Sequence, residues 1–361
     1  MRIKRIILLA LLVPIGAFLI FLLYASVNDF KPDKKINLFT TNQPGVLSDS
    51  SVIDLLIWNI GYAGLDASMD FFYDGGEQMR PSNEGVVSNL NGIKSALKAY
   101  EAYDFILLQE VDVNSKRSYH TRQVEALAEE FTAYQTYTGI NYKVFFVPIP
   151  LSNPMGQVES GLLSLSKHTP TTVDRYSFPG NYSWPMSLFM LDRCFMVQRH
   201  PLSNGHELLI VNTHNSAYDD GSLRMQQMTY LRDFLLNEYK EGNYLIVGGD
   251  WNQTPYGFTP ELPSHLFDTV NLTFVEKDFP EPVWSWAFDP TLPTNRRVSV
   301  PYNKSTSLTT VIDYFLLSPN ISIEEVKTVD TDFQFSDHQA VRLQARLNPN
   351  NPDQSTLINL P

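Results

Sequence analysis

Short apolar runs alternate with polar segments along most of the chain, and many of these runs are rich in β-branched and aromatic residues. Such runs are typical of β-strands. They predict strands over Val52–Trp58, Asp104–Gln109, Lys143–Val147, Leu162–Ser166, Phe189–Gln198, Glu207–Thr213, Tyr244–Gly248, Thr310–Leu317 and Ala340–Ala345.

Three further segments have apolar residues spaced three or four positions apart, which predicts amphipathic helices. They are Val86–Tyr100, Thr121–Phe131 and Leu223–Tyr239. Strands and helices do not alternate strictly, so the pattern favours a mixed α+β layered fold over a barrel of eight β/α units.

The chain begins with a hydrophobic segment of a different kind. Residues Ile6–Tyr24 are uncharged and apolar, and Arg2, Lys4 and Arg5 precede them. At ~1.5 Å per residue this run gives roughly 28 Å of helix, close to the ~30 Å hydrocarbon core of a bilayer. We therefore predict a transmembrane signal-anchor in residues 1–27, with a cytoplasmic basic flank and the main domain outside the cytoplasm. A cleaved signal peptide and a buried core helix are the alternatives.

The rest of the chain divides into three parts. Residues 28–50 are polar and contain Pro and Gly, which predicts a linker. Residues 51–347 carry the strand and helix patterns and form the predicted globular domain. Residues 348–361 are predicted to be a flexible tail.

Charge and cysteine content exclude some classes of function. The net charge of −12 argues against tight, non-specific binding of nucleic acid, which depends on neutralising phosphates. We therefore expect no stable nucleic-acid complex, although an enzyme that meets a phosphate ester briefly is not excluded. Cys194 is the only cysteine, so an intrachain disulfide and a thiolate-rich zinc site are both excluded.

Polar side chains stand at the ends of the apolar runs with unusual regularity. In the stretch IVGGDWNQTP, residues two apart should point the same way, so we expect Asp250 and Asn252 to face one site while Trp251 packs beneath it. Gly248 and Gly249 should let the backbone come close to its neighbours. The polar residues in comparable places elsewhere are Asn59, Glu110, His214, Asp313, Asp337 and His338.

The chemistry of this set points to a metal. Strand ends hold side chains rigidly, as catalysis requires. The set contains carboxylates, amides and two histidines but no thiolate. Oxygen ligands suit a hard cation such as Mg²⁺, Mn²⁺ or Ca²⁺. Histidines are then available for proton transfer or for stabilising negative charge.

Six motifs containing these residues occur in a fixed order: WN (58–59), LQE (108–110), NTH (212–214), GDWN (249–252), IDYFLLS (312–318) and SDHQAV (336–341). In order and spacing they resemble the endonuclease/exonuclease/phosphatase superfamily, over about Ser51 to Leu347. The resemblance implies a four-layered α/β/β/α sandwich of two facing mixed β-sheets flanked by helices, with the active site at one end. The neutral sphingomyelinase-like and DNase I-like branches both stay open.

The resemblance also implies which residues hold the metal. By position, Glu110 is similar to the principal metal ligand of the family, with Asn59 beside it orienting or ligating. Asp337 is similar to a second carboxylate of the metal site.

Five residues are implied as catalytic in the same way. Asp250 and Asn252 match the pair that positions the attacking water and the phosphate. Asp313 matches the partner that orients His338. His214 matches the histidine that hydrogen-bonds the phosphate or protonates the leaving group.

Substrate contacts are predicted from two arginines and one loop. Residues 61–84 form a long aromatic insert in which Arg80 could meet a phosphate, against a purely structural loop. Arg193 could also face the phosphate, or form a plain salt bridge. Trp284 and Trp286 favour a lipid or other surface substrate slightly, against simple packing in a loop.

Together these features predict a membrane-anchored, divalent-metal-dependent phosphoesterase, with a phosphodiesterase as the first choice. Its substrate would be a lipid headgroup, a nucleotide or a nucleic acid. The catalytic domain would lie outside the cytoplasm on a single-pass anchor. The alternatives are a catalytically silent binding module on the same fold and a DNase I-like nuclease.

Overall fold

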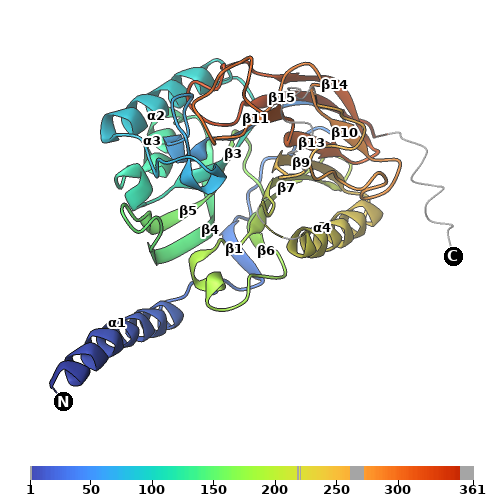
Figure 1. Cartoon of the computed structure of the whole chain (residues 1–361). Coiled ribbons are helices and arrows are strands. Elements are labelled where there is room, and N and C mark those ends of the chain that lie inside the picture. The colour runs from blue at the N-terminus through green and yellow to red at the C-terminus, as the bar shows by residue number, and fades with distance from the viewer. Residues whose placement is uncertain (1, 218, 220, 261–271, 350–361) are drawn as a thin grey trace.

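Two β-sheets face each other across the centre of the protein in a computed structural model that describes residues 2–217, 219, 221–260 and 272–349 (Figure 1). Over these residues the larger sheet has seven strands, in the order β1 (Lys35–Thr40), β6 (Thr172–Ser177), β7 (Cys194–Pro201), β8 (Glu207–His214), β9 (Tyr244–Asp250), β13 (Asp313–Leu317) and β10 (Ser285–Ala287). The smaller has six, in the order β14 (Ile321–Thr328), β15 (Val341–Leu347), β2 (Val52–Asn59), β3 (Phe105–Asp112), β5 (Gly156–Ser166) and β4 (Gln135–Val147). A short hairpin pairs β11 (Asn295–Arg296) with β12 (Thr309–Thr310).

Both sheets are mixed, because β2–β3 and β8–β9 are parallel while the other ladders are antiparallel. The core between them is apolar: Ile57 and Phe105 of one sheet pack with Ile210, Ile246 and Phe315 of the other. Strands at this interface are buried on both faces, which explains their nearly continuous apolar runs.

Helices cover the two outer faces (Figure 1). The helix α4 (Ser222–Lys240) buries Leu231 and Leu235 against the larger sheet. On the smaller sheet, α2 (Asn83–Lys98) and α3 (Gln123–Glu130) do the same. The predicted four-layered α/β/β/α sandwich is therefore confirmed.

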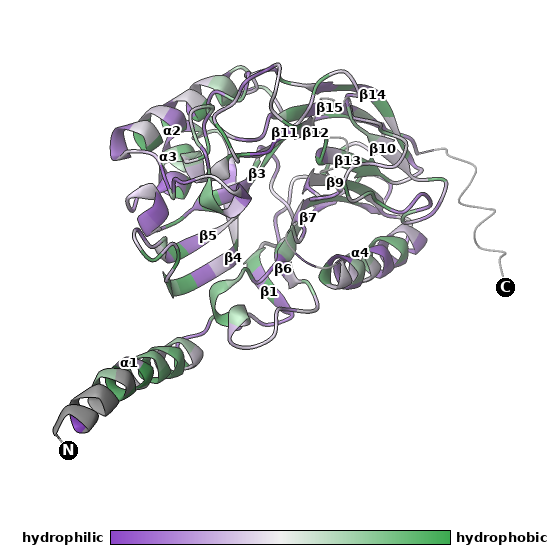
Figure 2. Ribbon diagram, in the orientation of Figure 1, coloured by the Kyte–Doolittle hydropathy of each residue, from purple (hydrophilic) through white to green (hydrophobic). Residues whose placement is uncertain are grey.

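Local sequence explains where α2 begins and which face it buries. The side chain of Ser82 accepts a hydrogen bond from the backbone N–H of Gly85, which caps the helix. Val86, Ile93 and Leu97 face inward at helical spacing. Figure 2 shows the result, since hydrophobic and hydrophilic residues alternate along α2 and α4.

The N-terminal hydrophobic segment forms α1 (Arg2–Val27), which contacts the sandwich through its C-terminal turns. Phe21 stacks on Phe189 with ring centroids 5.8 Å apart, and Tyr24 lies edge-on to Phe145 at 4.9 Å. Considering the residues whose side chains the structure describes, we find no helix long and apolar enough to cross a membrane. The predicted transmembrane span thus lacks support from the structure.

Residues 28–50 are more ordered than the predicted linker. They contribute the edge strand β1, which pairs antiparallel with β6, and Leu47 forms an isolated bridge with Leu202. The stretch Lys35–Thr40 buries its apolar side chains only partly, as an edge strand does. Of the predicted tail, residues 350–361 lie outside the described residues.

One glycine allows the close approach of β8 and β9 beneath the ends of the strands. Gly249 has φ +151°, and a Cβ added there would lie 2.0 Å from the carbonyl oxygen of Thr213. The expected role of this glycine is therefore confirmed.

We predict that Gly249→Ala destabilises the fold far more than Gly205→Ala. Gly205 also has a positive φ, +88°, but an added Cβ would meet nothing within 4 Å, so that substitution should cost only the left-handed strain of about 1–2 kcal/mol. Urea unfolding of both variants measures the difference. Equal losses of unfolding free energy would show that the contact with Thr213 relaxes easily.

Candidate active site

The polar residues at the strand ends meet at one end of the sandwich. The carboxyl ends of β2 and β3 lie together, as do those of β8 and β9, and the antiparallel β13 and β15 begin at the same end. In the ladders Asp250 lies opposite both His214 and Asp313. The structure gathers here all eight residues predicted for catalysis or metal binding: Asn59, Glu110, His214, Asp250, Asn252, Asp313, Asp337 and His338.

Buried amides join the two sheets just below and at the site. Asn212 of β8 donates to the carbonyl of Leu108 at 3.2 Å and accepts from Gln109 Nε2 at 2.8 Å. At the strand ends, Asn59 Nδ2 donates to Asp250 Oδ2 at 2.9 Å. Because buried amides need partners, these bonds fix how the sheets lie relative to each other.

Glu110 projects into the site from a β-bulge. The pairing of β3 with β5 shifts between Leu108 and Val111, and Glu110 has φ +54°. Bulges of this kind redirect side chains and occur beside active sites. The Glu110 carboxylate is partly exposed and lies 3.9 Å from Nη1 of Arg117, which is itself bonded to Asp112.

Asp313 and His338 form a buried ion pair, as predicted. His338 Nδ1 lies 2.8 Å from Asp313 Oδ2, and Trp58 Nε1 donates to the His338 carbonyl at 2.9 Å. Burial alone would lower the pKa of His338, but Asp313, Asp337 and Asp250 outweigh it and hold that pKa well above its usual value. Burial raises the pKa of Asp313 to about 6, opposed by His338. At neutral pH the pair is therefore imidazolium and carboxylate.

His214 has the opposite character. Its Nε2 lies 3.4 Å from Asp250 Oδ2 and 4.0 Å from Glu110 Oε1. Burial, aided by Arg193, keeps the pKa of His214 well below its usual value, so the ring is neutral at pH 7. A neutral ring can donate a hydrogen bond but is a poor source of a proton for a leaving group.

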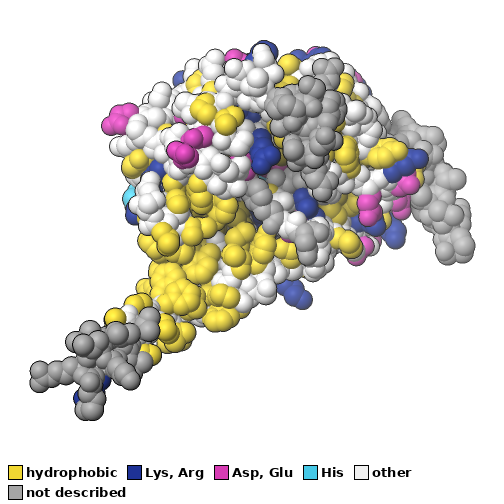
Figure 3. Space-filling view, viewed as in Figure 1, with side chains coloured by type: hydrophobic (Ala, Val, Ile, Leu, Met, Phe, Trp, Pro, Cys, Tyr) yellow, Lys and Arg dark blue, Asp and Glu magenta, His cyan; other side chains and the backbone are white. Residues whose placement is uncertain are grey.

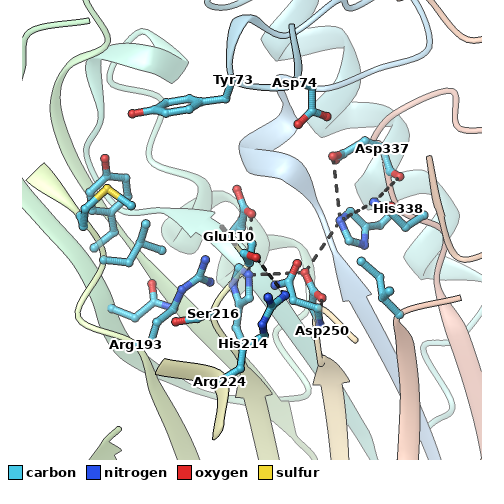
Figure 4. Close-up of a pocket in the computed structure, with 18 of the residues that line it drawn as sticks. Tyr73, Asp74, Glu110, Arg193, His214, Ser216, Arg224, Asp250, Asp337 and His338 are labelled. Atoms are coloured by element: carbon cyan, nitrogen blue, oxygen red, sulfur yellow. Dashed lines mark hydrogen bonds and ion pairs between the residues drawn. The ribbon is translucent and has the colours of Figure 1, made fainter. Parts of the chain in front are cut away.

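The donor set at the mouth of the site fits a hard cation. Glu110, Asp74 and Asp337 point into one space (Figure 4). Burial raises the pKa of Asp337 to about 7, and the like charges of Glu110 and Asp74 add to that rise. A divalent cation would remove this repulsion and keep Asp337 ionised, and oxygen atoms are the ligands it prefers.

A second group of possible metal ligands is better explained by hydrogen bonding. Asp250, Asp313 and His338 each offer an atom within 4.8 Å of the others. The bond between His338 and Asp313 already uses one ring nitrogen and one carboxylate oxygen, and Nε2 of His338 lies 3.8 Å from Asp250. We therefore treat this group as a hydrogen-bonded network, which we call the catalytic network after the role predicted for it.

The side chains of Asn59 and Asn252 have specific arrangements in the structure. The side-chain oxygen of Asn59 accepts from the backbone N–H of Gly61 at 3.0 Å, which leaves its NH₂ group for Asp250 and Glu110. In this arrangement the Asn59 amide orients the two carboxylates, which is one of the two roles predicted for it. Asn252 has φ +51°, so the backbone leaves the strand after Asp250 and the expected extended geometry is wrong. Its Nδ2 donates to the carbonyl of Asn215, although Asn252 still lines the pocket.

A pocket of about 570 Å³ lies over these residues. Arg193 lines it, as predicted, beside Glu110 and His214 (Figure 4). Arg80 does not line it, because its guanidinium donates to the Lys116 carbonyl and to Asn153 Oδ1. The structure therefore gives Arg80 a role in holding loops.

The insert 61–84 forms one wall of the pocket. Tyr62, Leu65 and Phe71 line the pocket and also belong to a buried cluster with Tyr142 and Met155. The insert that was predicted to be a functional loop therefore lies beside the candidate active site.

Trp284 and Trp286 belong to the core. Trp286 lies 5.1 Å from the ring of Trp251, which stacks on Tyr314, and Trp284 is buried against Tyr239. The packing prediction for Trp251 is confirmed, whereas the link between Trp284, Trp286 and a surface substrate is wrong.

Three residues of the site carried no signal in the sequence analysis. Asp74 stands in the turn-rich part of the insert. Asn295 Nδ2 lies 3.1 Å from His338 Nε2, and the exposed Arg297 lines the pocket two residues further on. All three lie outside the strand ends from which the site was predicted, and only the turn at Asp74 could have drawn attention.

Comparison of sequences gives a family. A family model described as the endonuclease/exonuclease/phosphatase family matches residues 58–338. No curated protein matches the chain significantly.

Solved structures give the same fold. An endonuclease/exonuclease/phosphatase from Beutenbergia cavernae is 19% identical with a TM-score of 0.57, over 82% of this chain and 72% of that one. One from Bacteroides vulgatus is 14% identical with a TM-score of 0.52, over 82% and 100%. ANGEL2, a 2′,3′-cyclic phosphatase solved with adenosine-2′,3′-vanadate, is 14% identical with a TM-score of 0.53, over 85% and 99%. At these identities the likeness shows the fold.

We predict that His338→Ala lowers kcat/KM by ~10²–10⁴-fold, the usual loss for a proton-transferring or charge-stabilising group. Asp313→Asn should reproduce much of that loss, because it removes the charge that holds the imidazolium. Since the two residues act as one unit, the double variant should lose little more than His338→Ala alone. The measurement is kcat/KM for all three variants, with thermal melts to check the fold.

His168 offers a matched control, because it is also a histidine paired with an aspartate: its Nε2 lies 2.7 Å from Asp104 Oδ1. Asp104 directly precedes β3, so this pair lies at the end of the sheet opposite the pocket. His168→Ala should leave kcat/KM unchanged. Independent multiplication of the losses from His338→Ala and Asp313→Asn would contradict the pairing.

Proposed function

This chain belongs to the endonuclease/exonuclease/phosphatase family, whose members are metal-dependent phosphoric ester hydrolases, and from that premise we propose that it is a phosphodiesterase. One observation carries the proposal: a buried imidazolium–carboxylate pair, a neutral histidine and oxygen-only metal ligands share one pocket. In-line attack of water on phosphorus needs a proton acceptor, donors to the phosphoryl oxygens and a cation.

Asp250 is the proposed proton acceptor. Its Oδ2 accepts a hydrogen bond from Asn59, and its Oδ1 accepts from the backbone N–H of Asn252 at 2.9 Å. These bonds hold the carboxylate in one orientation. As water attacks and the bond from phosphorus to the leaving oxygen breaks, the proton of the water passes to Asp250, and the leaving oxygen takes a proton from solvent.

His338 and His214 bind the phosphate in different ways. The His338 imidazolium, fixed by Asp313, stabilises the charge that grows on the phosphoryl oxygens. His214 stays neutral and contributes a hydrogen bond. Arg193, which lies beside His214 in the pocket, would add a positive charge toward the substrate.

Glu110, Asp337 and Asp74 are the residues that would hold the divalent cation, Mg²⁺ or else Mn²⁺ or Ca²⁺. When bound, the cation supplies Lewis-acid polarisation of a phosphoryl oxygen. The role of Asn59 in this proposal is to orient Glu110 and Asp250.

The net charge of −12 supports a substrate other than a stably bound nucleic acid. The cellular location is also a proposal: α1 carries exposed apolar side chains such as Phe18, Ile20 and Leu23, and its first turns carry the basic residues that precede the apolar run, which supports attachment to a membrane with the catalytic domain outside the cytoplasm.

We predict that the chain hydrolyses bis-p-nitrophenyl phosphate, that EDTA abolishes the activity and that Mg²⁺, Mn²⁺ or Ca²⁺ restores it. Glu110→Gln should remove one metal-ligand charge, so both the activity and the rise of the melting temperature on adding the cation should be lost. Glu101→Gln, at an exposed position in the turn that follows α2, should leave both unchanged.

Full activity after exhaustive chelation would disprove the metal requirement. A rise of the melting temperature with the cation but no turnover by the wild-type chain would favour the catalytically silent binding module.

A further inference from the structure

An uncharged, exposed apolar surface lies at the same end of the sandwich as the pocket. We propose that this surface docks on a lipid bilayer, so that the pocket takes its phosphodiester from the bilayer surface and the substrate is a phospholipid. The phospholipid substrate rests on the proposed phosphodiesterase function, whereas the docking on a bilayer does not depend on it.

The strand ladders place α1 and the pocket at one end. β1 begins at Lys35, which pairs with Tyr176 near the end of β6. The loop that follows β6, residues 178–193, lines the pocket with Tyr182, Met190 and Leu191. Because β2, β3, β8 and β9 also end here, α1 leaves the body at the end that carries the catalytic residues.

Four exposed side chains make up what we call the apolar collar. Leu151 is 88% exposed, and Ile149 stands beside it in the loop between β4 and β5. Trp184 is 62% exposed and Met186 is 54% exposed in the loop between β6 and β7. Figure 3 shows hydrophobic side chains continuing from α1 over the adjoining part of the body.

The collar is built on a packed base. Leu22 and Ala25 of α1 are buried with Leu188, and Phe145 and Phe189 pack against them. Trp184 Nε1 lies 3.2 Å from the hydroxyl of Ser26. The collar and α1 are therefore held together as one surface.

Apolar contacts lead from this base to the pocket. Phe189 also packs against the cluster of the insert, which contains Tyr142 and Met155. Met155 and Leu191 line the pocket as well as joining that cluster. An acyl chain that leaves the bilayer would therefore meet apolar side chains along this route, while the phosphate reaches Arg193 and His338.

The charge pattern favours a bilayer over a protein partner. Residues 6–28, 144–158 and 178–191 contain no Asp, Glu, Lys, Arg or His. Protein interfaces place such a core inside a polar rim and enrich it in Arg. Large apolar side chains together with an exposed tryptophan are found where proteins enter the interfacial region of a membrane.

The test uses the full chain with vesicles of phosphatidylcholine and phosphatidylglycerol. Trp184 is the one exposed tryptophan of the five, since the others are buried or partly buried. Vesicles containing dibrominated phosphatidylcholine should therefore quench the fluorescence of the wild type, and Trp184→Phe should remove the quenched component.

Turnover is compared on two substrates, vesicle phospholipid and soluble bis-p-nitrophenyl phosphate. Leu151→Asp and Met186→Asp should each lower phospholipid hydrolysis by about tenfold or more, since each replaces buried apolar area at the bilayer with a charge. They should change hydrolysis of the soluble diester by less than about twofold, because they lie outside the catalytic network. Val46→Asp is the matched control, because Val46 is also an exposed apolar residue, with 66% of its surface exposed, but lies at the opposite end of the sandwich. Its neighbour Leu47 forms a bridge with Leu202, which follows the far end of β7. Val46→Asp should leave both rates unchanged.

Absence of quenching in the wild type, or an equal loss for Val46→Asp, would overturn the docking surface. Quenching with turnover of the soluble diester but not of phospholipid would overturn the bilayer substrate. If the wild type hydrolyses neither substrate, the proposed function fails, and the quenching still decides whether the collar docks.

Discussion

The site depends on holding two separate sheets in a fixed position relative to each other. Glu110 and His338 belong to one sheet or its flanking loop, whereas His214, Asp250 and Asp313 belong to the other. The amide bridges from Asn212 and Asn59 cross between the sheets at this end. Each bond adds only about 0.5–1.5 kcal/mol, but a partner left unsatisfied would cost about 1–3 kcal/mol. The apolar contacts between the two sheets would allow several relative positions of the sheets. The amide hydrogen bonds therefore act mainly by excluding all but one of these positions.

A second constraint is the concentration of negative charge that this alignment creates. Asp313 is compensated directly by His338, and Asp250 accepts hydrogen bonds from two neighbours. Asp337 has weaker compensation, since its contact with His338 Nε2 is 3.9 Å, and burial beside Glu110 raises its pKa to about 7. The protein thus leaves part of this charge for a ligand to neutralise, which separates the proposed metal-binding side of the pocket from the proposed catalytic pair, whose charges compensate each other.

The apolar runs predicted most of the strands, and the polar residues that end them predicted the set of residues that meet, because both are local signals; β6 and β14 were not predicted. The resemblance to the family supplied the four layers and the pairing of Asp313 with His338. It did not predict details that depend on backbone handedness or on distant partners: the bulge at Glu110, the left-handed Asn252 and the orientation of the Asn59 amide. The edge strand β1 was hidden in a polar segment, because an edge strand buries too little to need a strong apolar pattern. Arg80 was misjudged and Asn295 was missed, because a loop and a two-residue strand place these side chains through contacts far apart in sequence.

The loop between β6 and β7 carries both Trp184 and Met186 on the outside and Tyr182, Met190 and Leu191 in the pocket wall. A partner that contacts the outer face of this loop and a substrate that occupies the pocket therefore act on the same stretch of backbone. By thermodynamic reciprocity, if contact with this loop from outside changes the affinity of the pocket for substrate by some factor, a bound substrate changes the affinity of the outer contact by the same factor. A single loop is enough to make such coupling possible without any rearrangement of the sheets.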